Sequence, residues 1–320
     1  MPPRSTAGPS LIDPKSLMAI RNLEFRARIV VEGFWNGLHR SPYHGFSVEF
    51  TEFRQYTPGD DLRYLDWRVF ARSDRFYIKK FEDETNLRCH LLVDHSRSMG
   101  FGSLPYTKSE YANTLAATLA YFLFKQGDAV GLLTFDERVR DILPPRNRAG
   151  HLRQVMLALE KPLAGQSTDF KVALTRVLQM VRKRGVVVLI SDLLAPLADL
   201  ERALGELCAF GHEALVFHLL VPAETSFKFD QAAIFQDLEN ERKLYVDPLT
   251  IRKTYMGKLR EHCLAARTIC EQRGIGYVLL STDRPLELAL FDFLRRRMER
   301  RKRGRSNARG WKRETAPVIE

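Results

Sequence analysis

The sequence predicts an α/β protein in which helices cover both faces of a mostly parallel central sheet, preceded by an N-terminal α+β extension. Three observations predict this class. From about residue 89 onward, short apolar segments alternate with longer segments of helical periodicity. Val186–Ile190 is apolar throughout, as expected of a strand that is buried on both faces. Gly127 and Gly185 stand where a helix would end and a strand begin.

The strands and helices follow one another in regular order. The expected parallel strands are Cys89–Val93, Ala129–Phe135, Val186–Ile190, Leu215–Leu220 and Tyr277–Leu280. The expected helices are Ser109–Lys125, His151–Leu159, Phe170–Arg184, Leu197–Phe210, Tyr255–Arg273 and Arg284–Arg300. Val139–Leu143 follows a short polar turn, so we expect it to return as an antiparallel edge strand. Near residues 223–248 the rhythm is interrupted, and we expect a small surface hairpin there.

The segment before residue 87 has a different pattern of apolar and polar residues. Ser16–Glu32 has the apolar spacing of a helix, and Phe46–Tyr56 and Phe76–Phe81 alternate like strands. Tyr56–Arg68 is dense in Arg, Asp and aromatic residues, which predicts Arg–carboxylate pairs with aromatic packing or, alternatively, a docking surface. The predicted organisation is a flexible N-terminus at 1–14, an extension at 15–86, an α/β domain at 87–294 and a disordered basic tail at 295–320.

The net charge of +11 is concentrated at the C-terminal end. Arg295–Arg313 contains eleven Lys or Arg residues and a single acid, Glu299, so the rest of the chain is nearly neutral. A solvated tail is the simplest interpretation, and the alternative function is binding of nucleic acid or an anionic surface through this tail. Four cysteines without a CxxC pair, no leader-like segment and no apolar run of membrane-spanning length favour a cytoplasmic protein.

The most informative motif follows the first apolar strand. Asp94, Ser96 and Ser98 come directly after Cys89–Val93, at alternating positions. Loops at the carboxyl ends of strands are where open α/β sheets bind their ligands. Carboxylate and hydroxyl oxygens are the ligands that hard divalent cations prefer. The motif therefore predicts the first part of an oxygen-rich site for Mg²⁺, with Mn²⁺ or Ca²⁺ as alternatives.

The remaining ligands are expected from other loops at the same edge. Asp192 follows the strand Val186–Ile190, and two neighbouring carboxylates repel each other unless a cation lies between them. Ser167 or Thr168 can offer a hydroxyl, whereas Asp169 is expected to cap the following helix. The predicted metal site consists of Asp94, Ser96, Ser98, Thr168 and Asp192.

Other interpretations of these residues lead to other functions. In the simplest, Ser96 and Ser98 only cap a turn and Asp94 pairs with an arginine. A phosphatase with an aspartate nucleophile needs a second Asp two residues later, where this chain has Ser96. The chain also lacks a P-loop, a GxSxG elbow and an HExxH motif, so we expect no catalytic residues and a non-enzymatic protein.

At this point the sequence resembles a known bacterial family, the one catalogued as domain of unknown function 58, over roughly residues 15–295. The upstream residues that carry the resemblance are Gly37, Leu38, His39, Arg40, Ser41, Phe50, Phe53, Arg54, Tyr56, Pro58, Gly59, Asp60, Asp61, Arg63, Asp66, Trp67, Arg68, Ala71, Arg72 and Glu82. The Asp94-x-Ser96-x-Ser98 motif, with Thr168 and Asp192, resembles the metal-ion-dependent adhesion site of von Willebrand factor type A domains.

The resemblance implies a Rossmann-like type A domain whose metal keeps one coordination position open for an Asp or Glu of a partner protein. It also implies a working relationship with MoxR-type AAA+ ATPases in chaperone-like assembly or maturation of other proteins. We therefore expect a metal-dependent interaction adaptor without a membrane span. His95 and Arg97 fill the variable positions of the motif, and either side chain would weaken cation binding if it pointed inward.

Overall fold

The computed structural model describes residues 11–40, 52–55, 77–80, 87–163, 168–170, 172, 175–176, 179, 184–229, 233–236 and 243–296. The predicted Arg–Asp–aromatic network in Tyr56–Arg68 and most of the basic tail, from residue 297 onward, lie outside these residues. The chain forms two compact units, Met1–Ser10 with Trp35–Asn86 and Leu11–Phe34 with Leu87–Glu320. Residues 11–34 thus group with the α/β unit and not with residues 35–86.

The smaller unit contains an antiparallel strand pair. Strand β1, Glu52–Gln55, pairs with β2, Tyr77–Lys80, so that Glu52 lies opposite Lys80 and Gln55 opposite Tyr77. These strands fall inside the two segments whose alternation predicts strands.

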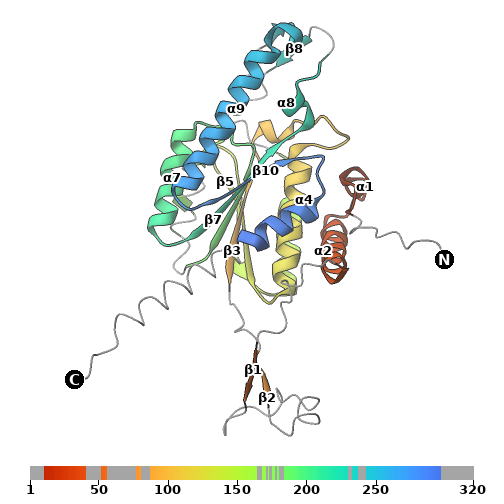
Figure 1. Ribbon diagram of the computed structural model, residues 1–320, viewed down its shortest axis with the longest axis vertical. Helices are drawn as coiled ribbons and strands as arrows, with labels where there is room; N and C mark the ends of the chain where they lie inside the picture. Colours follow the sequence, from red (N-terminus) through yellow and green to blue (C-terminus); the bar gives the residue numbers. More distant parts are fainter. Residues whose placement is uncertain are drawn as a thin grey trace, which may run out of the picture. The chain divides into compact units, whose positions relative to one another are not determined.

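The larger unit is built on a mostly parallel sheet (Figure 1). Its strands within the described residues are β3 (Arg88–Asp94), β4 (Ala129–Phe135), β5 (Val139–Arg146), β6 (Val186–Ser191), β7 (Glu213–Leu220) and β10 (Gly276–Ser281), in the order β10-β7-β6-β3-β4-β5. All neighbours are parallel except β4 and β5. The predicted fold class and the antiparallel edge strand are therefore confirmed.

Helices cover both faces of this sheet. They are α4 (Lys108–Lys125), α5 (Ala149–Leu159), α7 (Leu197–Ala209), α9 (Pro248–Gln272) and a helix over 286–296; helical residues also occur between 170 and 179. In Figure 1, α7 and α9 lie on one side of the sheet and α4 on the other. A core cluster joins Leu92 and Leu189 of the sheet to Leu204 of α7 and Cys270 of α9. Gly127, with a φ of 84°, ends α4 as predicted.

The N-terminal segment forms two helices where one was predicted. Helix α1, Pro14–Met18, ends before Asn22, whose side chain accepts a hydrogen bond of 2.7 Å from the backbone N–H of Phe25. Helix α2, Leu23–Arg40, starts there because an asparagine at this position satisfies a free helical N–H. The prediction of a single helix over Ser16–Glu32 was wrong because it overlooked this cap.

The segment after β7 departs from the prediction at both ends. Helix α8, Pro222–Ser226, occupies the start of the segment in which we expect only a hairpin, and Phe227 ends this helix in the left-handed region. A small antiparallel hairpin of β8 (Ala233–Gln236) and β9 (Lys243–Val246) follows. Helix α9 begins at Pro248, earlier than the predicted Tyr255, because Asp247 caps it and proline fits its first turn. Among the described residues, no helix is long and apolar enough to cross a membrane.

Candidate functional site

The candidate site lies where β3 and β6 end. The two strands are parallel neighbours, with Val93 opposite Ile190, so their carboxyl ends meet at one edge of the sheet. Asp94 is the last residue of β3, and Ser191 is the last residue of β6. Asp94 and Asp192 are fully buried, so the strand register brings two carboxylates into the interior of the protein at this edge.

Hydrogen bonds hold both carboxylate oxygens of Asp94. Its Oδ1 accepts a bond of 2.9 Å from the backbone N–H of Ser96, and its Oδ2 accepts one of 2.6 Å from the hydroxyl of Ser191. Thr168 also approaches Oδ2, at 3.5 Å between the oxygens. The hydroxyls of Ser96 and Ser98 lie 3.1 Å apart. The hydroxyls of Ser191, Thr168 and Ser96 therefore lie near Asp94, and the hydroxyl of Ser98 pairs with that of Ser96.

The loop that carries Thr168 is held against β4. The backbone N–H of Asp169 donates to the carbonyl oxygen of Asp136, at 3.0 Å. The side chain of Asp169 accepts a bond of 3.1 Å from the backbone N–H of Val172, as predicted for a helix cap. This anchoring brings Thr168 to the carboxyl edge from a third loop.

Asp192 has a different partner, which the sequence analysis did not identify. The ammonium of Lys108 lies 2.7 Å from Asp192 Oδ2 and 2.9 Å from Glu224 Oε1. Lys108 is 1% exposed, and Glu224 belongs to the short helix α8. A buried ion pair is tolerated only when its geometry is good and its charges are matched. Lys108 therefore fixes Asp192 and connects the site to α8.

Burial, neighbouring charges and hydrogen bonds together shift the pKa values of Asp94 and Lys108. Burial and repulsion from Asp192 raise the pKa of Asp94 from 3.8 to about 7, although hydrogen bonds from Ser191 and Ser96 oppose the rise. Burial would lower the pKa of Lys108, but the charges of Asp192 and Glu224 outweigh it and raise that pKa overall. Lys108 is thus charged at neutral pH, whereas Asp94 lies close to its protonation midpoint.

The two bulky residues of the motif differ in exposure. His95 is buried, and its Nε2 lies 3.0 Å from Oδ1 of Asn113 on α4, so its ring is engaged outside the oxygen cluster. Arg97 is only half-buried. Thr168 is also half-buried, and the neighbouring Leu194 is 53% exposed. Thr168 is therefore the predicted ligand that, with the nearly buried Ser98, is not fully enclosed, and Leu194 is an exposed apolar side chain two residues after Asp192.

The donor set fits a divalent cation. Within the described residues no three His, Cys, Asp or Glu side chains form a metal-binding group. The predicted ligands are different in kind, since they combine two carboxylates with hydroxyls, and such oxygens suit Mg²⁺. Asp94, Asp192 and Glu224 carry three negative charges when ionised and Lys108 carries one positive charge. A divalent ion would balance the remaining charge of −2.

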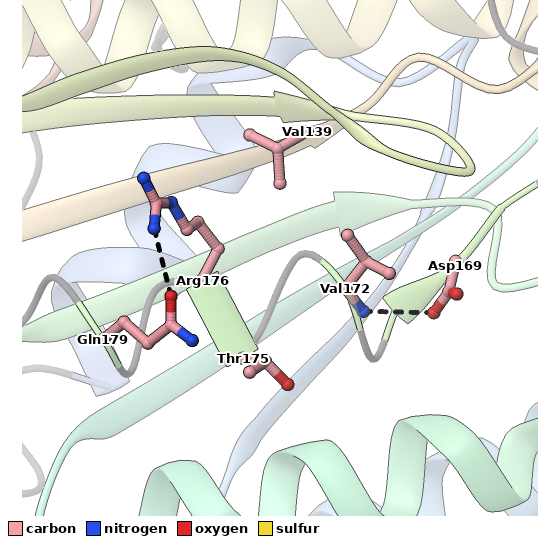
Figure 2. A pocket seen from close by; sticks show the side chains of 6 residues that line it. All are labelled: Val139, Asp169, Val172, Thr175, Arg176 and Gln179. Atoms are coloured by element: carbon pink, nitrogen blue, oxygen red, sulfur yellow. Dashed lines mark hydrogen bonds between the residues drawn. The ribbon is translucent and has the colours of Figure 1, made fainter.

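The described residues also line a hollow of about 470 Å³ (Figure 2). It is lined by Val139, Asp169, Val172, Thr175, Arg176 and Gln179. Arg176 is turned to Gln179, to which it donates a hydrogen bond of 3.1 Å. Among these described lining residues there is no predicted ligand, so the hollow is separate from the site although Asp169 adjoins Thr168.

Sequence reasoning missed Ser191, Lys108 and Glu224. Ser191 could have been found from the two predicted strands: when Val93 pairs with Ile190, the next residues, Asp94 and Ser191, lie at the same edge of the sheet. Lys108 gives a weaker signal in the sequence. A positive charge in the first turn of a helix is disfavoured by the helix dipole, which suggests a stabilising partner elsewhere in the fold. For Glu224 we find no local signal in the sequence.

Fold and site together define the class of this protein: an α/β protein with a buried cluster of carboxylates and hydroxyls at the carboxyl edge of its sheet. Residues 52–264 match the family described as "Protein of unknown function DUF58", and the chain belongs to this family. A relative, the uncharacterized protein Rv1480 of Mycobacterium tuberculosis, is 32% identical over 292 residues, which cover 88% of this chain and 90% of that protein.

Solved structures are similar at low sequence identity. An aerotolerance-related membrane protein from Bacteroides fragilis is 15% identical, with a TM-score of 0.46, over 63% of this chain and 96% of that one. The conserved hypothetical protein BatB from Bacteroides thetaiotaomicron is 14% identical, with a TM-score of 0.46, over 66% of this chain and 99% of that one.

Proposed function

We propose that this protein is a non-enzymatic, metal-dependent adaptor for protein interaction. Asp94, Ser96, Ser98, Thr168 and Asp192 would hold Mg²⁺, or alternatively Mn²⁺ or Ca²⁺. When bound, the cation supplies an open coordination position for an Asp or Glu of a partner. The observation that carries the proposal is the buried cluster with its charge of −2 among hydroxyl oxygens.

The surrounding residues position these groups. Ser191 orients Asp94 through its short hydrogen bond, and Lys108 orients Asp192. We infer that a partner's carboxylate reaches the cation past the half-buried Thr168, and that the exposed Leu194 contacts an apolar side chain of the partner. This combination favours recognition of an acidic residue beside an apolar one.

A non-enzymatic role agrees with the chemistry of the motif. An aspartate nucleophile needs a proton donor close by, and the residue two positions after Asp94 is Ser96. The hydroxyl of Ser96 shares a hydrogen bond with Ser98 and has no acidic character at neutral pH. These residues suit cation binding better than proton transfer.

The family resemblance supplies the proposed partner, a MoxR-type AAA+ ATPase, and the proposed setting, assembly or maturation of other proteins in the cytoplasm. The test is binding between the two purified proteins in Mg²⁺ and in EDTA. We expect binding that requires Mg²⁺, is lost in Asp94→Ala and is retained in Asp283→Ala. Asp283 is a matched control because it is an exposed carboxylate just after β10. Equal binding in EDTA would refute the proposal.

A further inference from the structure

Lys108 occupies a position that its helix does not explain. It stands in the first turn of α4, after the cap residue Thr107, where the helix dipole disfavours a positive charge. It is 1% exposed, although lysine is rarely buried without a partner. Its ammonium contacts Asp192 and Glu224, and both distances are below 3 Å. The reason for its position is therefore the carboxylate cluster.

The formal charges of the cluster add up to a net negative charge. Asp94, Asp192 and Glu224 contribute −3 when ionised, and Lys108 returns the total to −2. The ammonium also binds Oδ2 of Asp192, while Oδ1 accepts, among the described residues, a long bond of 3.4 Å from the backbone N–H of Leu194. One oxygen of Asp192 is thus held by Lys108, and the other is weakly engaged.

We propose that Lys108 is a permanent cation of the site, whose charge lowers the negative charge that a bound metal must balance. The inference rests on the proposed function, because it concerns the affinity of the same site. Glu224 belongs to the same charge network, because its carboxylate and that of Asp192 contact the same ammonium group.

Substitutions at these two residues change the cluster charge in opposite directions. Lys108→Met leaves −3, Glu224→Gln leaves −1, and the double variant returns to −2. Coulomb attraction for a divalent ion grows with the negative charge of a buried site. We therefore expect Lys108→Met to bind Mn²⁺ about tenfold or more tightly than the wild type and Glu224→Gln to bind it about threefold more weakly, with the double variant between the two.

The experiment is Mn²⁺ titration calorimetry of the full chain at pH 8, with thermal unfolding in EDTA and in Mn²⁺ as a second readout. Lys125→Met is the matched control, because it removes the same charge from the exposed end of the same helix. Lys125→Met should bind Mn²⁺ like the wild type. Mn²⁺ should raise the unfolding temperature most in Lys108→Met and least in Glu224→Gln.

The outcomes separate the two proposals. A wild-type protein that binds no Mn²⁺ at millimolar concentration refutes the proposed function, and the role of Lys108 falls with it. A wild type that binds Mn²⁺, with Lys108→Met binding equally or more weakly, refutes the role of Lys108 alone. If Lys108→Met does not fold, Glu224→Gln and the double variant decide: the double variant must bind more tightly than Glu224→Gln.

Discussion

At the scale of single residues, Asp94 has the most demanding environment. It is fully buried, and Asp192 repels its charge, yet its two oxygens accept hydrogen bonds from Ser96 and Ser191. Such bonds favour the ionised carboxylate, whereas burial favours the protonated one. In the metal-free protein, the ionised form of Asp94 therefore lowers the stability of the folded state.

This environment predicts how stability depends on pH. The pKa of Asp94 is about 7 in the folded protein, above its ordinary value of 3.8. Its stabilising contribution is then fully present below about pH 4 and is lost as the pH rises through about 7. In EDTA, the unfolding temperature of the wild type relative to Asp94→Asn should fall between pH 5 and pH 8, and Mn²⁺ should restore it at pH 8.

The comparison with Asp94→Asn is needed because other groups make the stability of the protein rise with pH, whereas Asp94 makes it fall. Burial lowers the pKa of His90 and of His218 to about 4, so their contribution to stability grows with pH up to about 6.5. These histidines are present in both proteins, so their effects cancel in the difference between the two unfolding temperatures. A difference that stays constant from pH 5 to pH 8 would show that Asp94 is not perturbed.

How far single residues can be predicted depends on their separation in the chain. Asp94, Ser96 and Ser98 are visible because they follow one apolar strand at alternating positions. Ser191 follows from the pairing of two predicted strands. Lys108 lies 84 residues from Asp192 and 116 residues from Glu224, and only the folded chain brings these three together.

At the scale of elements, α2 shows how an amphipathic helix joins the α/β unit. Its buried side chains recur with helical spacing and are Leu23, Ala27, Val30, Val31 and Phe34. The ring of Phe34 packs against Phe122 of α4, at 5.9 Å between ring centroids, and against Phe291, at 4.6 Å. The stripe thus anchors residues 11–34 to the body of this unit.

Truncation of this anchor should be costly. Phe34→Ala should lower the free energy of unfolding by about 3–5 kcal/mol, because it removes a fully buried ring. Phe25→Ala, on the same helix, removes a ring that is 49% exposed and should cost far less. Urea unfolding of both variants measures the difference, and equal losses would mean that α2 is not docked through Phe34.

The errors in predicting elements share a physical cause. Strands that are buried on both faces have an unmistakable apolar pattern, and the strands of the central sheet were found almost residue by residue. Helix starts depend instead on one capping side chain. Asn22 divides the N-terminal segment, and Asp247 starts α9 at Pro248. Pro248, at the end of the segment predicted as a hairpin, is the first residue of this helix.

At the scale of the whole molecule, the sequence predicted the α/β class and the edge of the sheet that carries the site, because both follow from the alternation of strands and helices. The charge balance of the site was not predictable, since Lys108 and Glu224 come from elements whose packing the pattern does not specify. A basic tail is equally visible in the sequence, but its role stays a prediction.

Deletion of the tail separates the adaptor from the alternative function. Removal of residues 297–320 should leave Mn²⁺ binding and Mg²⁺-dependent partner binding unchanged, because the predicted ligands all precede residue 193. Fluorescence anisotropy with duplex DNA and with RNA, at several salt concentrations, checks the alternative. Nucleic-acid binding that is steeply salt-dependent and is lost on deletion would favour it.

We propose that the cluster at the ends of β3 and β6 binds a divalent cation. Titration calorimetry of the full chain with Mg²⁺ and with Mn²⁺ at pH 8 tests it most directly. We expect one cation per chain, bound in the wild type and not in Asp94→Ala, with Asp283→Ala unaffected. Absence of binding at millimolar concentration in the wild type would leave the fold standing and contradict the mechanism.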